Sequence, residues 1–151
     1  MMTITFVGHS TLYNHTELFG QVFKSLSEHI ASNETVQFYC GGYGEFDQLC
    51  ARACRAFKDI HKNCEIVFVT PYLTEPKQKD LRVLIESKHY DAILYPPLEA
   101  VPLKFAISKR NEWMMSQADL VIAYVAHTHG GAYKTLEYAR RKKKQIVNLA
   151  E

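Results

Sequence analysis

The sequence predicts an α/β domain of three layers, in which helices cover both faces of a mainly parallel sheet of about six strands. Short runs rich in β-branched and aromatic residues alternate with longer segments whose apolar residues recur every three or four positions. The strand-forming runs are apolar almost throughout, which is typical of parallel strands buried on both faces. No linker interrupts this alternation, so we expect a single domain that spans residues 1–151.

The first elements follow one another in this regular order. A β-rich run at 3–7 predicts the first strand. Residues 17–31 carry apolar side chains at every fourth position, which predicts an amphipathic helix with Thr16 as its N-cap. A second strand is expected at 36–40, and a second helix at 46–60 begins directly after a cluster of glycines.

The middle of the chain repeats the pattern with shorter elements. A third strand is expected at 64–70, where Pro71 ends it, and a short helix is expected at 77–87. A fourth strand at 91–95 stops at a pair of prolines. The segment 103–117 is then expected to be helical.

The last elements include a run of five cations. A nearly all-apolar strand is expected at 119–126, a helix then runs from a glycine pair to about residue 143, and a final strand is expected at 145–149. The cations at 140–144 allow two interpretations: the last turn of a helix, or a patch for nucleic acid or anionic lipid. The apolar strand directly after them favours the helix end.

The composition is that of an ordinary globular protein. Hydrophobic residues make up 47% and charged residues 23%, which excludes a disordered tail, a fibrous repeat and a coiled coil. The longest apolar run, at 120–126, is far shorter than the about 20 residues of a membrane helix. The N-terminus lacks the pattern of a secretory signal, so we expect a cytoplasmic protein with reduced cysteines. The four cysteines contain no CxxC pair, and we expect neither a metal site nor a cofactor.

Unusual residues follow the strand ends at which such sheets bind ligands. In an open parallel sheet the ligand lies beyond the carboxyl ends of the strands, near the point where strand order reverses. Gly8, His9 and Ser10 follow the first expected strand, and we predict that they contact a ligand. His127 and His129 follow the fifth strand, and because no third ligand stands out we expect loop histidines rather than a zinc site.

Two glycine turns each join a strand to a helix. Gly41, Gly42 and Gly44 follow the second strand, and Gly130 and Gly131 follow the fifth. Glycine lets the backbone approach a ligand, and the helix N-terminus after it offers unpaired N–H groups to phosphate. A tight turn without a ligand is the alternative for either turn alone. Because both turns are expected on one edge of the sheet, we predict a phosphate-bearing ligand between them.

Polar side chains near these turns complete the predicted site. Arg110 offers a planar fork suited to phosphate, although a surface salt bridge is the alternative, and Asn111 lies beside it. Thr135 would donate a hydroxyl hydrogen bond, while Lys134 supplies either a charge to the ligand or a solvated surface side chain. Asp47 is interpreted as a carboxylate that favours the positive end of the second helix.

Several motifs together resemble the SLOG superfamily. They lie at 39–44, 109–114, 118–123, 130–131 and 135–139. This superfamily includes the LOG phosphoribohydrolases, the DNA-processing protein of bacterial transformation and small bacterial proteins of unassigned role. The resemblance is strongest to the small bacterial members and covers about residues 3–149. It implies a Rossmann-like domain of the SLOG type.

The LOG enzymes within this superfamily suggest catalytic residues. These enzymes remove ribose 5-phosphate from a nucleoside monophosphate and carry a PGGxGTxxE motif together with an arginine-lysine helix. When the motif is aligned on Gly130 and Gly131, the resemblance implies that Glu137 and Arg110 are catalytic if this chain is an enzyme.

The chain departs from the LOG motif at several positions. His129 stands at the proline, Tyr133 at the third glycine and Lys134 at the threonine. Asn111 replaces the lysine, and an alignment shifted by one residue places Tyr138 at the glutamate. These departures leave open whether the chain is an enzyme.

Together the residues and the resemblance predict a protein that binds a nucleotide or a nucleotide-derived small molecule, in the role of a sensor. An N-glycosidase of the LOG type, acting on nucleoside 5′-monophosphates, is the alternative, and a nucleic-acid-associated protein is the third. Neither a membrane nor a nucleic acid is the expected partner. We also expect a homodimer, for which Trp113, Met114 and Met115 would offer apolar surface, although the core is the other expected place for these three.

Overall fold

The computed structural model describes residues 1–73 and 75–151. They form six strands, five α-helices and a short 3-10 turn, η1 (Leu103–Phe105). The strands are β1 (Met2–Gly8), β2 (Val36–Cys40), β3 (Cys64–Val69), β4 (Ala92–Leu94), β5 (Leu120–Tyr124) and β6 (Gln145–Asn148). The helices are α1 (His15–His29), α2 (Glu45–Ile60), α3 (Glu75–Glu86), α4 (Ala106–Gln117) and α5 (Gly131–Arg141). Among the described residues, no helix combines the length and the apolar composition needed to cross a membrane.

The sheet is parallel throughout, with the strand order β4-β3-β2-β1-β5-β6. β1 pairs with β2 through Met2 and Val36, and with β5 through Ile4 and Leu120. The order runs outward from β1 to β4 on one side and from β5 to β6 on the other, so the switch point lies between β1 and β5. Because the strands are parallel, the loops after β1, β2 and β5 meet at one edge, and the prediction that both glycine turns share an edge is confirmed.

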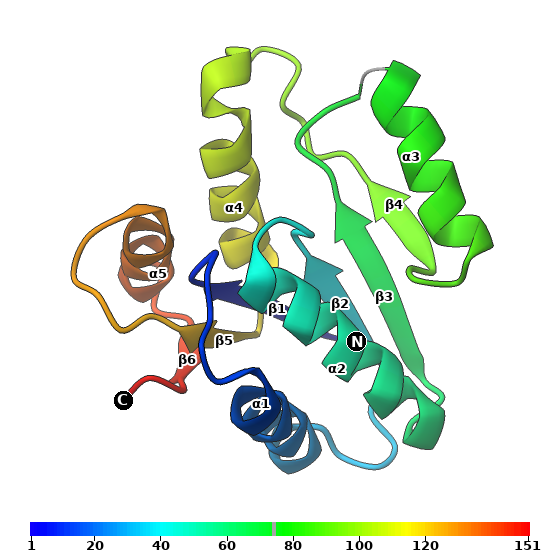
Figure 1. Cartoon of the computed structure of the whole chain (residues 1–151), viewed down its shortest axis with the longest axis vertical. Coiled ribbons are helices and arrows are strands. Elements are labelled where there is room, and N and C mark those ends of the chain that lie inside the picture. The colour runs from blue at the N-terminus through cyan, green and yellow to red at the C-terminus, as the bar shows by residue number, and fades with distance from the viewer. Residues whose placement is uncertain (74) are drawn as a thin grey trace.

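Helices cover both faces of the sheet and complete the three predicted layers. Figure 1 shows α1 and α2 together on one side, and α4 with α5 on the other. Successive residues of β5 point to the two faces of the sheet in turn. Leu120 and Ile122 belong to the core with α1 and α2, and Val121 and Ala123 belong to the core with α4 and α5. This alternation explains why the strand is apolar at every position.

Some element boundaries differ from those expected. Helix α1 begins at His15, and the Leu18 N–H donates to the carbonyl of Asn14 at 3.0 Å, so Asn14 is the N-cap. Thr16 lies inside the first turn, and its prediction as the N-cap was wrong. The helix expected at 103–117 is divided into η1 and α4, because Phe105 has φ −106° and ψ 1°. Helix α5 ends at Arg141 rather than near residue 143, where a positive φ turns the chain toward β6.

The apolar residues proposed for a dimer surface belong to the core. Met114 is 2% exposed and Met115 is fully buried, while Trp113 stacks on Tyr39 with ring centroids 5.5 Å apart. The core interpretation is confirmed for Met114 and Met115, and Trp113 is partly buried against the same core, so the three do not form the apolar surface from which we expected pairing. The homodimer itself stays a prediction.

Candidate functional site

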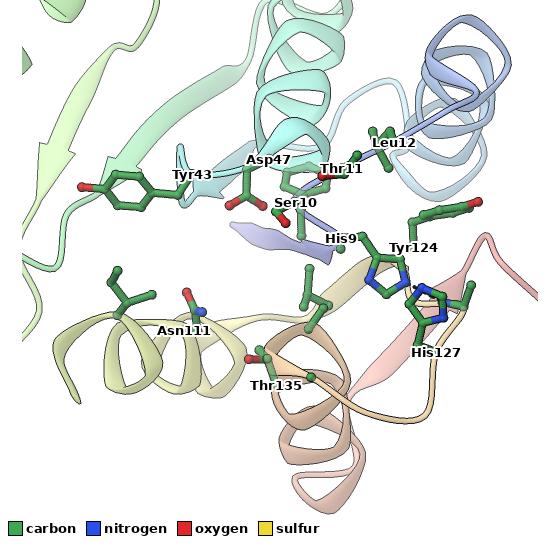
Figure 2. A pocket seen from close by; sticks show the side chains of 18 of the residues that line it. His9, Ser10, Thr11, Leu12, Tyr43, Asp47, Asn111, Tyr124, His127 and Thr135 are labelled. Atoms are coloured by element: carbon green, nitrogen blue, oxygen red, sulfur yellow. Dashed lines mark hydrogen bonds between the residues drawn. The ribbon is translucent and has the colours of Figure 1, made fainter. Parts of the chain in front are cut away.

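A cavity of about 740 Å³ opens at the switch point of the sheet. Its walls come from the loop after β1, the start of α2, one side of α4, the loop after β5 and the first turns of α5. Figure 2 shows these side chains converging on the cavity from elements far apart in the chain. The position is the one at which open parallel sheets bind ligands, and the volume suits a small organic molecule.

The loop after β1 forms the floor of the cavity. Gly8, His9 and Ser10, predicted as ligand contacts, all line it. A Cβ at residue 8 would lie 2.3 Å from the ring of Phe46, so only glycine lets β1 pass this close to α2. The Nε2 atom of His9 accepts a hydrogen bond from the Ala126 N–H at 2.8 Å, which joins the loops on both sides of the switch point.

The first glycine turn is closed by the chain itself. The N–H of Glu45 donates to the Ser10 carbonyl at 2.9 Å, and the N–H of Phe46 points to the His9 carbonyl at 3.4 Å. These are the first two amides of α2, so the β1 loop caps the first residues of the helix. Gly42 has φ +76° and a Cβ there would lie 2.1 Å from the Phe68 ring, so its glycine serves the tight turn.

The glycines of this first turn do not line the cavity. Gly41, Gly42 and Gly44 lie behind its wall, which is formed here by Tyr43 and Asp47. A Cβ at Gly44, where φ is +87°, would lie 3.0 Å from the Ser10 Cα, so close packing against the β1 loop requires glycine.

The second glycine turn is open. Gly130 and Gly131 line the cavity, and a Cβ built on either residue would meet no atom within 4 Å. Gly130 is the N-cap of α5 and no side chain caps the helix. Within the described part of the chain, no acceptor contacts the N–H groups of Gly131, Ala132 and Tyr133. Three backbone donors and the positive end of the α5 dipole are therefore available at the cavity.

Arg110 is almost completely buried and holds the backbone. It is 1% exposed, and its Nη1 donates to the carbonyls of Gly41 at 2.9 Å and Val69 at 2.7 Å. Its Nε donates to the Asn111 Oδ1 at 2.9 Å. Arg110 thus connects α4 to the ends of β2 and β3, and burial lowers the pKa of its guanidinium. Asn111 lines the cavity and its amide lies on the α4 wall in Figure 2.

Asp47 is a cavity residue whose importance the sequence did not indicate. Of the described residues that line the cavity, it is the sole acid. Burial raises its pKa to about 7, although the neighbouring Arg110 and a hydrogen bond from the Tyr43 backbone favour the charged form. Its position in the first turn of α2, after a glycine turn at the ligand edge, is the signal that could have found it.

Three histidines lie together at the rim. The rings of His9 and His127 have centroids 4.6 Å apart, and those of His127 and His129 are 5.4 Å apart. Burial and these two neighbours lower the pKa of His9. His127 and His129, expected to be loop residues without a role, line the cavity. No group of side chains within the described residues has an arrangement that could hold a metal ion.

Of three other predicted residues, one lines the cavity and two lie outside its lining. Thr135 lines the cavity from the second turn of α5 and is 7% exposed. Lys134 is exposed and is not part of the lining. Glu137 lies outside the lining too, and its carboxylate pairs with Arg140 on the outer face of α5. The catalytic role of Glu137 stays a prediction.

Comparison with solved structures identifies the fold. No protein-family model and no curated protein matches the sequence. DNA processing protein A (DprA) from Streptococcus pneumoniae superposes with a TM-score of 0.66 at 18% identity, over 97% of this chain and 49% of that one. The chain has the Rossmann-like fold of this protein.

Two further structures share this fold. DprA from Helicobacter pylori has a TM-score of 0.63 at 14% identity, over 96% of this chain and 63% of that one. TM1055, a structural-genomics target, has a TM-score of 0.57 at 15% identity, over 97% of this chain and 72% of that one. The chain spans about half the length of the S. pneumoniae protein. The H. pylori structure is described as showing a single-stranded DNA binding mode.

Proposed function

We propose that this SLOG-type domain binds a nucleotide or a nucleotide-derived small molecule, with a phosphate of the ligand at the N-terminus of α5. The observation that carries the proposal is the open glycine turn. Three unpaired amides, from Gly131 to Tyr133, adjoin a cavity at the switch point of a parallel sheet. Backbone donors of this kind, backed by a helix dipole, suit an anion with several acceptor oxygens.

The rest of the cavity suits the remainder of such a ligand. Thr135 adds a hydroxyl one turn beyond the open amides. Tyr124, Ile107 and Met114 supply aromatic and apolar surface against which a base or a sugar can pack. The first glycine turn is left out of the phosphate site, because its glycines do not line the cavity and the β1 loop already accepts hydrogen bonds from the first two amides of α2.

The positions of the cations argue for a small molecule rather than DNA. The cations at 140–144 lie at the C-terminal end of α5, and the cavity lies at its N-terminal end. Arg140 pairs with Glu137 and Glu151, and the Lys144 Nζ donates to the Ser116 carbonyl at 3.0 Å. These contacts use part of the charge that a DNA-binding patch would need.

Calorimetry with Gly131 variants tests the proposal. Gly131→Asp places a carboxylate at the first residue of α5, where it stabilises the helix by about 0.5 kcal/mol while repelling an anion. We expect Gly131→Asp to weaken the binding of nucleoside 5′-phosphates by about tenfold or more. Gly131→Asn is the matched control, because it has the same shape without the charge, and it should bind more tightly than Gly131→Asp.

Two results would contradict the proposal. One is equal affinity for nucleotides in the Gly131→Asp and Gly131→Asn variants. The other is a wild-type chain that binds single-stranded DNA with a steep salt dependence and binds no nucleotide, which would assign the protein to the nucleic-acid class. Thermal unfolding of each variant checks that the fold is intact, and since a Cβ at residue 131 meets no atom within 4 Å, we expect no loss of stability.

A further inference from the structure

We propose that Asp47 orients the ligand by accepting a hydrogen bond from a donor group, a sugar hydroxyl or a base amine, at the end opposite the phosphate. This inference rests on the proposed function, because it assumes a phosphate at the N-terminus of α5. It adds a selectivity that phosphate binding alone does not give. A ligand that lacks the donor would bind through its phosphate only.

The two walls of the cavity carry opposite electrostatic character. Figure 2 shows Asp47 on the α2 wall and Thr135 on the α5 wall, with the cavity between them. The α5 wall presents backbone N–H groups, which attract an anion. The α2 wall presents a carboxylate, which repels an anion and accepts hydrogen bonds when it is ionised. A ligand that is anionic at one end and rich in donors at the other matches both walls.

The groups around Asp47 lie close to its carboxylate but leave it able to accept a further hydrogen bond. A Cβ at Gly41 would lie 3.0 Å from the Asp47 Oδ2 and 3.3 Å from the Arg110 Nη2, so glycine lets the two charged groups approach each other. Arg110 gives its Nη1 hydrogen bonds to backbone carbonyls rather than to Asp47. Within the described residues no cation lies within ion-pair distance of Asp47, which leaves it free to accept from a ligand.

The protonation behaviour of Asp47 agrees with this role. Burial raises its pKa to about 7, so the carboxylate is close to its titration midpoint at neutral pH. A donor that reaches it stabilises the ionised form and replaces part of the hydration that burial has removed. Arg110 and the Tyr43 N–H act in the same direction, so a ligand donor completes an environment that already favours the charge.

Titration calorimetry with three probes separates the contributions of the phosphate, the sugar and the base to binding. The probes are inorganic phosphate, ribose 5-phosphate and adenosine 5′-monophosphate, each measured with wild type, Asp47→Asn and Asp59→Asn. Asp59 is the matched control, since it is an exposed aspartate on the same helix and lies outside the cavity. We expect Asp47→Asn to bind inorganic phosphate at least as well as wild type, and to lose about tenfold in its preference for a donor-bearing probe over phosphate.

The pattern of loss identifies the donor. An equal loss of preference for ribose 5-phosphate and for the nucleotide assigns the donor to the sugar. A loss confined to the nucleotide assigns it to the base. Unchanged preference for both probes in Asp47→Asn overturns the inference while the proposed function stands. A wild-type chain that binds none of the three probes overturns the proposed function, and the inference with it.

A measurement on wild type keeps the test decisive if Asp47→Asn does not fold. The ratio of the affinities for ribose 5-phosphate and methyl phosphate is followed from pH 5.5 to 8.5. Both probes are phosphate monoesters that titrate over a similar pH range, and the rim histidines His9, His127 and His129 face the phosphate of either probe, so these effects largely cancel in the ratio. We expect the ratio to rise as Asp47 ionises, and a ratio that stays constant over this range contradicts the inference.

Discussion

The Nε2 atom of His9 accepts a hydrogen bond from the backbone N–H of Ala126 at 2.8 Å, across the switch point of the sheet. This bond requires the neutral ring with its proton on Nδ1. It holds the loop after β1 against the loop after β5, and the same β1 loop caps α2 through the carbonyls of His9 and Ser10. The β1 loop therefore caps α2 after the first glycine turn, and it also forms the floor of the cavity that the second glycine turn lines.

Arg110→Met is expected to lower stability rather than only ligand affinity. The substitution leaves the buried carbonyls of Gly41 and Val69 without their side-chain donor. We expect the free energy of unfolding to fall by about 3 kcal/mol. Chemical denaturation measures it, and a variant as stable as wild type would show that Arg110 does not hold the ends of β2 and β3.

Gly42→Ala and Gly131→Ala are expected to separate the two glycine turns. At Gly42 the backbone has φ +76° and a Cβ would lie 2.1 Å from the Phe68 ring, so the variant is strained and overpacked. We expect a loss of about 2–3 kcal/mol. At Gly131 a Cβ meets no atom within 4 Å, and alanine is expected to leave the thermal midpoint unchanged or raise it. Equal losses in both variants would contradict this difference.

The stability of the chain is expected to depend on pH through Asp47. Folding raises its pKa from 3.8 to about 7, so the folded chain binds the proton more tightly than the unfolded chain. The resulting stabilisation is fully present below about pH 4 and is lost as the pH rises through about 7. Asp47→Asn removes this dependence, so its stability relative to wild type should increase from pH 4 to pH 8. Denaturant unfolding at several pH values measures this difference in stability, and a difference that stays constant with pH would contradict the prediction.

Glu137→Gln is expected to have little effect on ligand binding. Glu137 pairs with Arg140 outside the cavity lining, in a partly exposed ion pair worth less than about 1 kcal/mol. We expect wild type to release no free base from nucleoside 5′-monophosphates, and the variant to bind them as wild type does. Base release by wild type that Glu137→Gln abolishes would establish the N-glycosidase alternative instead.

The fold was predictable because its determinants are local in the sequence. The apolar run at 120–126 indicated a strand buried on both faces, and β5 indeed alternates between two cores. Glycines after the second and fifth strands placed both turns at one edge, since parallel order alone decides which loops meet. Boundaries were less predictable, because a cap such as Asn14 depends on backbone angles as well as residue type.

The site was predictable only in part, because its chemistry depends on partners distant in the chain. Arg110 was expected to face a phosphate, but its acceptors are carbonyls of residues 41 and 69, which no local pattern reveals. Asp47 was interpreted as a helix-dipole residue, since its distance from the α5 turn is a property of the folded sheet. The two glycine turns look alike in sequence, and only the position of the β1 loop distinguishes the closed turn from the open one.

The most direct test of the central claim is an NMR titration that follows the backbone amides of wild type. Adenosine 5′-monophosphate is added while the resonances of Gly131, Ala132 and Tyr133 are recorded. We expect the resonances of these three amide protons to move downfield in a saturable manner as they donate to phosphate. We expect smaller changes at the amides of Glu45 and Phe46, because these already donate to carbonyls of the β1 loop. Saturable shifts at Glu45 and Phe46 without shifts at 131–133, or no shifts at either helix end, would contradict a phosphate site at the N-terminus of α5.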